Sequence, residues 1–346
     1  MSTIVVTGGG TAGHIMPHIV LKPHLDKHFN KVVYIGSKTG MEKDIAAKHG
    51  GFEFYEIETV KLDRSKLLKN LLIPYKYLKG KKQAKQILKQ VRPSIIFSKG
   101  GYVALPVVSA AKSLNIPVVA HESDLTLGLA NRLSKNKCNC ICTTFEQTAK
   151  TLGKKGVYTG SPIIINTAKI DKPNTQKPIL LITGGSLGAR AINQAIWNSI
   201  SELCKTFYII HQVGKGNINP NIKNADYKQI EFASDLSSLI KQADVVVSRA
   251  GSNTIFELAT YHKPMLLIPL PKGASRGDQV DNAKYFESLG YAKVLLQENL
   301  NTQSLITELN TLLTNKQKYI STLKNANLPN GTEKIINMIL LYKNPC

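Results

Sequence analysis

Cysteine is scarce in this sequence, with five residues in a chain of 346. Three of them, Cys138, Cys140 and Cys142, alternate with other residues, so a strand would place their side chains on one face. No second Cys or His pair stands at the spacing of a zinc site, and we expect these cysteines to be small apolar core residues. So few cysteines are also typical of a cytoplasmic protein.

Long apolar runs are missing as well. No segment approaches the roughly 20 apolar residues that a membrane-spanning helix needs. The N-terminal residues have no basic flank and no signal-peptide core, and they lead at once into a β-branched run. The sequence therefore predicts a cytoplasmic protein without a membrane span.

Acidic residues are few relative to basic ones: 23 Asp and Glu against 45 Lys and Arg, a formal net charge of +22. Such a surplus suggests an anionic partner, which could be nucleic acid, an acidic membrane surface or a phosphorylated substrate. The solvated lysines of a lysine-rich proteome are the alternative explanation. The sequence has no aromatic–basic RNA-binding signature and no recognisable DNA-binding helix pair, so we expect no nucleic-acid partner.

Segments typical of strands and helices alternate along the chain twice. The expected strands are residues 4–7, 32–35, 52–57, 94–98, 117–120 and 138–144, then 178–183, 207–212, 244–248, 265–269 and 292–296. Helical spacing lies between them, and parallel strands need such crossovers, so the pattern predicts parallel sheets flanked by helices. The alternating pattern of strands and helices begins again after the segment Thr159-Gly160-Ser161-Pro162. We expect two doubly wound, Rossmann-like α/β domains, residues 1–162 and 163–331, facing a cleft at the carboxyl ends of their strands.

Three glycine-rich turns directly follow expected strands. They are Gly8-Gly9-Gly10-Thr11-Ala12-Gly13-His14, Gly100-Gly101-Tyr102 and Gly184-Gly185-Ser186-Leu187-Gly188-Ala189-Arg190. Glycine lets backbone approach a ligand, and the following helix offers free N–H groups and the positive end of its dipole, which suits a diphosphate. One such turn can serve tight packing without any ligand, but three of them favour the phosphate interpretation.

These turns lack the marks of other nucleotide sites. No acid ends the second strand to bind a ribose, and no Gly-Lys-Ser/Thr follows a turn, which argues against a dehydrogenase and an ATPase. No Asp-x-Asp pair follows a strand, so we expect neither a metal nor another cofactor, and the turns and helix dipoles would hold a diphosphate instead.

Two histidines stand near these turns. His14 begins the first helix, where the positive end of the dipole favours a neutral imidazole that can accept a proton; a structural role is the alternative. His121 and Glu122 follow an apolar strand. Glu122 could orient a base, bind sugar hydroxyls or cap a helix.

The second half of the chain has a polar constellation of its own. The small polar residues Ser252, Asn253 and Thr254 open a helix after the expected strand 244–248. Glu257 in that helix could accept both hydroxyls of a ribose, or it could be an ordinary solvated acid. Farther on, Gln279 offers the donor and the acceptor that recognition of hexose hydroxyls requires.

Taken in order, these motifs resemble the MurG family, whose members add N-acetylglucosamine to undecaprenyl-pyrophosphoryl-N-acetylmuramoyl-pentapeptide in peptidoglycan synthesis. The resemblance runs from about residue 4 to residue 330. It rests on the three glycine turns, on His121-Glu122, on Asn193 and on Arg249-x-Gly251-x-x-Thr254-x-x-Glu257.

The resemblance implies a GT-B fold, a UDP-sugar held mainly by the C-terminal domain, and inversion to a β-1,4 linkage. By motif position, the donor diphosphate would lie near Thr11, Ala12, Gly13, Ser186, Gly188 and Arg190. The ribose and phosphate would contact Ser252, Asn253, Thr254 and Glu257, and the sugar would contact Gln279. The acceptor would lie near Gly100, Gly101 and Tyr102. A final helix near residues 332–346 would return to the first domain.

Two positions that the resemblance assigns to the donor site depart from the family pattern. Asp124 stands where the family usually has Asn, and Ile164 stands where it usually has an Arg close to the donor diphosphate. Loss of that guanidinium removes a charge-assisted contact worth about 1.5–3 kcal/mol. Either Arg190 or Arg249 compensates, or the affinity for the donor is lower.

An inverting transfer needs a base at the acceptor hydroxyl and charge stabilisation on the departing diphosphate. We assign the base role to His14, with Glu122 as its partner or alternate. The alternative function is a GT-B glycolipid synthase, which would move a hexose from a UDP-sugar to diacylglycerol.

The segment 61–89 predicts a membrane contact because it contains ten basic residues and one acid, Asp63. An apolar helical face precedes Pro74, which is expected to interrupt the helix; the face consists of Leu67, Leu68, Leu71 and Leu72. A core helix with a basic rim is the alternative. We expect an anionic membrane surface, on the cytoplasmic side where the lipid acceptor is reached, to contact Lys69, Leu72, Lys76 and Lys79.

Overall fold

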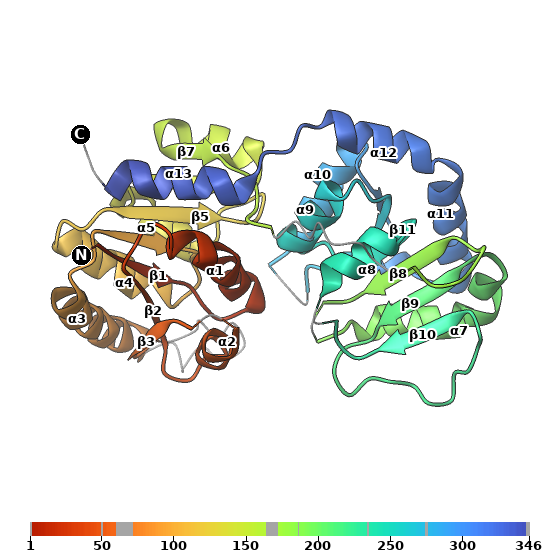
Figure 1. Ribbon diagram of the computed structural model, residues 1–346, viewed down its shortest axis with the longest axis horizontal. Helices are drawn as coiled ribbons and strands as arrows, with labels where there is room; N and C mark the ends of the chain where they lie inside the picture. The colour runs from red at the N-terminus through yellow and green to blue at the C-terminus, as the bar shows by residue number, and fades with distance from the viewer. Residues whose placement is uncertain are drawn as a thin grey trace. The chain divides into compact units, whose positions relative to one another are not determined.

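The computed structural model describes residues 2–49, 51–59, 72–163, 172–185, 187–233, 235–273 and 276–343, without the side chains of Ala12 and His49. The chain divides into two compact units: unit 1 comprises residues 1–163 and 329–346, and unit 2 comprises residues 164–328. Each unit has its own parallel sheet (Figure 1). Several residues singled out from the sequence lie outside the described ranges, namely Leu67, Leu68, Lys69, Leu71, Ile164 and Ser186.

Unit 1 is built on a seven-stranded parallel sheet with the strand order β3-β2-β1-β4-β5-β6-β7. The strands are β1 (Thr3–Thr7), β2 (Lys31–Ser37), β3 (Glu53–Ile57), β4 (Ile95–Ser98), β5 (Val118–Glu122), β6 (Cys140–Thr143) and β7 (Gly156–Tyr158). The chain order reverses between β1 and β4, as in a doubly wound sheet, so the turns after these two strands are neighbours at one edge.

Helices cover both faces of this sheet, and the middle of its central strands is therefore apolar. Ile4 and Val6 face one cluster of buried side chains, and Val5 faces the other. The helices are α1 (Ala12–Leu25), α2 (Glu42–His49), α3 (Ile73–Val91), α4 (Ala104–Ser113), α5 (Leu129–Ser134), α6 (Glu146–Leu152) and α13 (Gly331–Lys343), with short 3-10 turns η2 (Lys135–Lys137) and η3 (Gly153–Lys155). Helices α1 and α13 lie on the first face, and α3 and α4 lie on the second.

Helix α13 returns to unit 1 after the whole of unit 2 (Figure 1). Its Ile335, Ile336 and Ile339 are buried in the same cluster as Ile4. Its first residue lies against the segment that leaves unit 1, since a Cβ on Gly331 would stand 2.1 Å from the carbonyl oxygen of Ser161. Two segments far apart in sequence therefore run side by side where the chain passes between the units.

Unit 2 has a six-stranded parallel sheet with the order β10-β9-β8-β11-β12-β13. Its strands are β8 (Ile179–Thr183), β9 (Tyr208–Gln212), β10 (Tyr227–Ile230), β11 (Val245–Ser248), β12 (Met265–Leu267) and β13 (Lys293–Val294). Its helices are α7 (Arg190–Thr206), α8 (Leu236–Gln242), α9 (Ser252–Thr260), α10 (Asp278–Ser288), α11 (Thr302–Thr314) and α12 (Lys316–Asn325), with the 3-10 turn η4 (Gln297–Asn299). Helices α7 and α11 cover one face of the sheet with apolar side chains.

The predicted fold class, two doubly wound Rossmann-like α/β domains, is confirmed by these sheets. Each expected strand is present, but the edge strands β7 and β10 were not predicted. Pro74 lies in the first turn of α3, where a missing N–H costs no helical bond; the helical face expected before it falls mainly on residues 67–71, outside the described part of the chain.

The three cysteines are buried, yet they do not share one face as predicted. Cys140 and Cys142 lie in β6 and pack in the cluster under α1 and α13. Cys138 precedes the strand and packs in the opposite cluster. The expected alternation failed there because the strand begins only at Cys140.

Candidate functional site

The carboxyl ends of β1, β4 and β5 lie next to one another in unit 1. Thr7 is paired with Ser98, and Ser98 is paired with Ala120. The turns that follow these strands therefore meet at one edge of the sheet, as the sequence predicts. They are the first glycine turn, the second glycine turn and the segment that begins with Ser123.

The first two glycine turns are in direct contact. A Cβ on Gly101 would lie 2.3 Å from the carbonyl oxygen of Gly9, and Gly101 has a φ of +79°. A Cβ on Gly10 would lie 2.6 Å from the ring of Tyr102. Glycine is required at these positions because backbone and an aromatic ring already occupy the space.

His14 is the third residue of α1, close to the first glycine turn. Its Nδ1 lies 2.8 Å from Oγ1 of Thr11. This hydrogen bond restrains the imidazole ring, since the hydroxyl can donate to an unprotonated Nδ1 or accept from a protonated one. The structure thus gives Thr11, expected near the donor diphosphate, an orienting contact with His14.

Glu122 is the last residue of β5 and is buried, so it does not follow the strand as predicted. Its carboxylate accepts hydrogen bonds from Asp124 N at 3.1 Å, Gly128 N at 2.8 Å and Asn131 Nδ2 at 2.9 Å. Burial raises the pKa of Glu122, and the charge of Asp124 adds to the rise. The hydrogen bonds recorded for Glu122 all go to the loop 124–131 rather than to His14, so the carboxylate shapes that loop.

Lys99 is a buried residue at this edge that the sequence reasoning missed. It stands between β4 and the second glycine turn, and its Nζ donates to Nδ1 of His121 at 2.6 Å and to Oγ of Ser123. Burial lowers the pKa of Lys99 to about 8. A lysine beside a glycine turn looks solvated in the sequence; only its place shortly after the apolar run 95–97 hints at burial.

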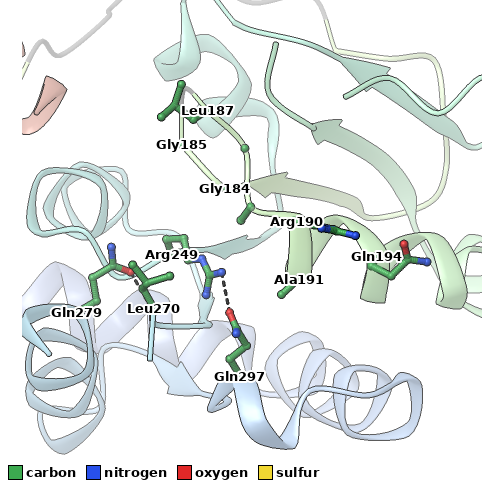
Figure 2. A pocket seen from close by; sticks show the side chains of 12 residues that line it. Gly184, Gly185, Leu187, Arg190, Ala191, Gln194, Arg249, Leu270, Gln279 and Gln297 are labelled. Carbon is green, nitrogen blue, oxygen red and sulfur yellow. Dashed lines mark hydrogen bonds between the residues drawn. The ribbon is translucent and has the colours of Figure 1, made fainter. Parts of the chain in front are cut away.

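Unit 2 contains a pocket of about 770 Å³ at the carboxyl end of β8 (Figure 2). The third glycine turn and the start of α7 form one side of it. The residues lining the pocket are Gly184, Gly185, Leu187, Gly188, Ala189, Arg190, Ala191, Gln194, Arg249, Leu270, Gln279 and Gln297. This set includes Gly188, Arg190 and Gln279, which the sequence assigned to the donor.

A buried network fixes the third glycine turn. Gly188 packs on Val213, because a Cβ on Gly188 would lie 1.9 Å from the Val213 carbonyl oxygen. That oxygen accepts from Nδ2 of Asn193 at 2.8 Å. His211 lies 3.1 Å from Oδ1 of Asn193 and 2.9 Å from the hydroxyl of Tyr227, and burial lowers the pKa of His211 to about 3. The neutral imidazole of His211 therefore has a structural role: it holds Asn193, which in turn binds the backbone on which Gly188 packs.

The two arginines at the pocket differ in what their guanidinium groups already bind. Arg249 donates through Nη1 to the carbonyl oxygens of Ile268 and Pro269, at 3.0 and 3.2 Å, and through Nη2 to Oε1 of Gln297 at 2.8 Å (Figure 2). Arg190 is exposed at the N-terminus of α7 and has no hydrogen bond or ion pair to any residue that the structure describes. Of the two, Arg190 is the cation available to an anionic ligand.

Gln279 is held by the backbone in an orientation that suits ligand binding. Its Oε1 accepts from Leu270 N at 3.0 Å, while its amide nitrogen has no partner in the described part of the chain. The sequence predicted Gln279 but missed Gln297, which comes from η4 and braces Arg249. No motif marks Gln297, because its role depends on a strand order that sequence spacing does not reveal.

The segment that opens α9 does not line this pocket, although the sequence expected Ser252, Asn253, Thr254 and Glu257 to hold the donor. Glu257 is half-buried. Burial raises the pKa of Glu257 to about 7, and the charge of Asp235 adds to the rise. A carboxyl group with a pKa near neutrality is typical of functional sites, so Glu257 keeps its place as a candidate.

The expected membrane contact falls at the start of α3. Leu72 is exposed, Lys76 is half-buried, and Lys79 is exposed with its Nζ 3.5 Å from Glu58 Oε1. Two large apolar side chains lie beside them in the sequence: Tyr75 is 66% exposed and Leu78 is 62% exposed. The start of α3 therefore presents apolar side chains to solvent, while Ala84 and Leu88 farther along the same helix are buried in the core.

Comparisons with known proteins bear on this site. The sequence matches the glycosyltransferase family 28 N-terminal domain over residues 4–143 and the glycosyltransferase family 28 C-terminal domain over residues 179–338. A relative from Clostridium tetani is 47% identical over 98% of both chains, and one from Clostridium perfringens is 44% identical over 97% of both. Both are named UDP-N-acetylglucosamine–N-acetylmuramyl-(pentapeptide) pyrophosphoryl-undecaprenol N-acetylglucosamine transferase.

Solved structures agree with these matches. The crystal structure of Acinetobacter baumannii MurG superposes with a TM-score of 0.77 at 25% identity, covering 98% of this chain and 99% of that one. The glycosyltransferase of kitacinnamycin gives a TM-score of 0.77 at 14% identity, over 99% of each chain, which shows likeness of fold alone. The GT-B fold expected from the sequence is confirmed by these superpositions.

Proposed function

The chain belongs to glycosyltransferase family 28, and we propose that it transfers N-acetylglucosamine from UDP-N-acetylglucosamine to undecaprenyl-pyrophosphoryl-N-acetylmuramoyl-pentapeptide in peptidoglycan synthesis. The observation that carries this proposal is the similarity, over nearly the full chain, to the two clostridial transferases of that name. The alternative acceptor, diacylglycerol, is disfavoured because these relatives are named for a muramyl acceptor.

The donor is proposed to bind in the pocket of unit 2. Its volume of about 770 Å³ is within the range of ligand sites, which is about 300–1,000 Å³. The N-terminus of α7 points backbone N–H groups at the pocket, and Arg190 adds a cation there. Together they suit a diphosphate without a protein-bound metal, and the amide nitrogen of Gln279 suits a sugar hydroxyl.

Arg190 also accounts for the departure at Ile164, where the family usually has an arginine. The guanidinium of Arg249 is occupied by two carbonyl oxygens and by Gln297, so it braces the pocket wall. Arg190 carries its charge into the pocket from the first turn of α7. We propose that Arg190 stabilises the charge that develops on the departing UDP.

His14 is proposed to be the general base. In the reaction, the acceptor hydroxyl oxygen bonds to C1 of N-acetylglucosamine, the bond from C1 to the UDP phosphate oxygen breaks, and the hydroxyl proton passes to the imidazole. Thr11 orients the ring through Nδ1. Glu122 supports the edge of the sheet where His14 lies, by holding the loop 124–131.

The start of α3 is proposed to contact the cytoplasmic leaflet of the membrane. Among the described helices, none is both long and apolar enough to cross a bilayer. Leu72, Tyr75 and Leu78 are exposed on α3, and Lys76 and Lys79 are interleaved with them. Apolar side chains can enter the interface while each lysine near anionic headgroups contributes on the order of 1 kcal/mol.

The function is tested by mass spectrometry of the products from UDP-N-acetylglucosamine and a lipid-linked muramoyl-pentapeptide, with diacylglycerol as the second acceptor. We expect a product heavier by one N-acetylhexosamine from the first acceptor and none from the second. Transfer to diacylglycerol alone would establish the glycolipid synthase instead.

The membrane contact is tested by sedimentation with vesicles of neutral or anionic lipid. The wild type should bind anionic vesicles, less strongly as salt rises, because the attraction is screened. A Tyr75→Ser/Leu78→Ser variant and a Lys69→Glu/Lys76→Glu/Lys79→Glu variant should lose binding, yet retain turnover on a short, water-soluble acceptor. Leu341→Ser, at an exposed leucine of α13, is the matched control. Unchanged binding by both α3 variants would exclude this surface.

A further inference from the structure

Lys99 is a buried cation that the proposed mechanism does not use. Its side chain is 2% exposed, and it joins two strand ends: it follows β4, while its partners His121 and Ser123 belong to β5 and the residues after it. An ammonium group is costly to bury, and such groups are rare in cores unless they are paired. Packing alone therefore does not explain why a lysine is buried at this position.

The hydrogen bonds of Lys99 define the state of His121. An ammonium group can only donate, so Nδ1 of His121 accepts and its proton is on Nε2. Nε2 then donates to the carbonyl oxygen of Gly160 at 3.1 Å. Through this imidazole, Lys99 connects the second glycine turn to the residues at which the chain leaves unit 1.

The charges around Lys99 are unevenly distributed. Two carboxylates favour its charged form, Glu122 first and Asp124 second. The other titratable side chains facing it are His18 of α1, His121 of β5 and Cys142 of β6. Burial lowers the pKa of both histidines, and a hydrogen bond with Cys140 together with burial raises the pKa of Cys142, so all three are neutral at pH 7. The local balance consequently lies between one ammonium group and two carboxylates.

Asp124 matters because of where it stands. It is the second residue after β5, at the edge that carries both glycine turns and His14, and it is half-buried. A carboxylate at an edge that receives a diphosphate-bearing substrate repels that substrate. Lys99 lies close to Asp124, because its Nζ donates to Oγ of the neighbouring Ser123, and its charge therefore offsets part of this repulsion from inside the protein.

We propose that Lys99 is a positioning residue of the transferase, which holds residues 121–124 against the glycine turns and neutralises Asp124 for the approach of the anionic acceptor. This inference rests on the proposed function. Lys99 and Asp124 are then a coupled pair, because the positive charge of the lysine offsets the repulsion between Asp124 and an anionic acceptor. Removal of the lysine alone should therefore be more harmful than removal of both charges.

The test is a cycle of Lys99→Met, Asp124→Asn and the double variant, measured as kcat/KM for the muramoyl acceptor. Lys99→Met should lower kcat/KM by about 10- to 100-fold, the range expected for a lost charge-assisted bond. Asp124→Asn should not improve the wild type, but should raise kcat/KM at least fivefold in the Lys99→Met background. Independent, multiplicative effects of the two changes would overturn the proposal.

A matched control separates this role from general stability. Lys263 is a half-buried lysine of unit 2 whose Nζ donates to the carbonyl oxygens of Lys241 and Ala243, and burial also lowers its pKa to about 8. Lys263→Met should lower the melting temperature while kcat/KM stays within about threefold, and Asp124→Asn should not rescue it. A rescue there would show that the effect is not specific to Lys99.

A second readout does not depend on activity. Nitrogen-15 NMR of the His121 ring should show the Nε2–H tautomer in the wild type and a changed Nδ1 resonance in Lys99→Met. If the wild type fails to transfer N-acetylglucosamine while the His121 signature behaves as expected, the proposed function fails and the positioning contact stands. An unchanged His121 spectrum in Lys99→Met would exclude the contact itself.

Discussion

The glycine turns of the two units look alike in sequence and differ in their surroundings. In unit 1, a Cβ on Gly8, Gly9 or Gly10 would come within about 3.0 Å of another residue: Lys99 and His18, Glu42, or Tyr102. In unit 2, a Cβ on Gly185 or Gly251 would meet nothing within 4 Å. The turn of unit 1 is enclosed throughout, whereas in unit 2 Gly184 and Gly188 are enclosed and Gly185 borders open space, as does Gly251 after β11.

This difference shows that a glycine-rich turn after a strand has two separate uses. In unit 1 the absent side chains let two turns and a tyrosine ring pack together, which makes a rigid support for His14. In unit 2 Gly188 serves packing on Val213, while Gly185 leaves room beside the pocket. We therefore expect substitutions in unit 1 to affect turnover and folding, and substitutions in unit 2 to affect the donor.

The largest expected effect is at His14 in unit 1. His14→Ala should lower kcat by about 10²–10⁴-fold, as loss of a general base does, while UDP affinity changes little because UDP binds unit 2. Steady-state kinetics and calorimetry with UDP measure the two quantities. Thr11→Val should give a smaller loss, since it only frees the ring. A His14→Ala enzyme with near-normal kcat would transfer the base role to another residue, and Glu122→Gln would be the next variant to examine.

The glycine comparison itself is tested by Gly101→Ala and Gly251→Ala. The first forces a Cβ against Gly9 at a φ of +79° and should lower the free energy of unfolding by about 1–3 kcal/mol or more. The second has space and an ordinary φ of −68°, so stability should stay nearly constant while the KM for the donor rises. Chemical denaturation measures the stability of both variants, and steady-state kinetics measures their KM for the donor. Equal destabilisation by the two changes would remove the distinction between the units.

At Glu257 the expected effect is smaller and depends on pH. Its pKa is raised from 4.5 to about 7 in the folded protein, so the stability it contributes is fully present below pH 4.5 and is lost as pH rises through 7. Glu257→Gln lacks this loss and should be more stable than the wild type above pH 7, by about 1–3 kcal/mol. Thermal unfolding between pH 4 and 8 measures the difference.

The same variant tests whether Glu257 binds the donor. The wild-type carboxylate forms as pH rises through about 7, so the KM for the donor should fall over that range. In Glu257→Gln the KM should be higher and nearly independent of pH. A variant with the wild-type pH profile would place the ribose elsewhere in unit 2.

Gln279 should give the smallest effect. Its amide nitrogen is proposed to donate to one sugar hydroxyl, and a single neutral hydrogen bond contributes about 0.5–1.5 kcal/mol. Gln279→Ala should therefore reduce discrimination between UDP-N-acetylglucosamine and its C4 epimer by about 2- to 10-fold, with kcat for the correct donor little changed. Competition between the two donors measures it, and Gln194→Ala at the same pocket is the control. Wild-type selectivity in the variant would exclude Gln279 from sugar recognition.

The fold class and the positions of most strands could be predicted because buried parallel strands are apolar runs, which the sequence displays plainly. Strands β7 and β10 were missed for the complementary reason. Both are short edge strands, and β10 (Tyr227–Ile230) carries Lys228 and Gln229 where a central strand would be apolar. An edge strand is fixed by its single neighbour rather than by its own pattern.

Candidate residues could be predicted where they belong to a local sequence motif. They could not be predicted where their hydrogen-bond partners come from other strands and loops of the sheet. His14 and Gln279 belong to local motifs and were found. The partners of Lys99 are 22 and 24 positions away, and those of Arg249 extend 48 positions to Gln297. Glu122 was found, but its bonds to the loop 124–131 turned out to be structural. Tertiary pairing, which residue spacing does not encode, decides such roles.

The position of α13 in the chain has a consequence for synthesis. The ribosome makes β1 first, yet Ile335, Ile336 and Ile339 of α13 complete the buried cluster that β1 faces. All of unit 2 lies between them in the sequence and has its own core. Domains ordinarily fold as they emerge, starting from the N-terminus. Here unit 2 can fold while one face of the unit 1 sheet is still uncovered, because α13 has not yet been synthesised. Unit 1 is therefore the first to be synthesised and the last to complete its core.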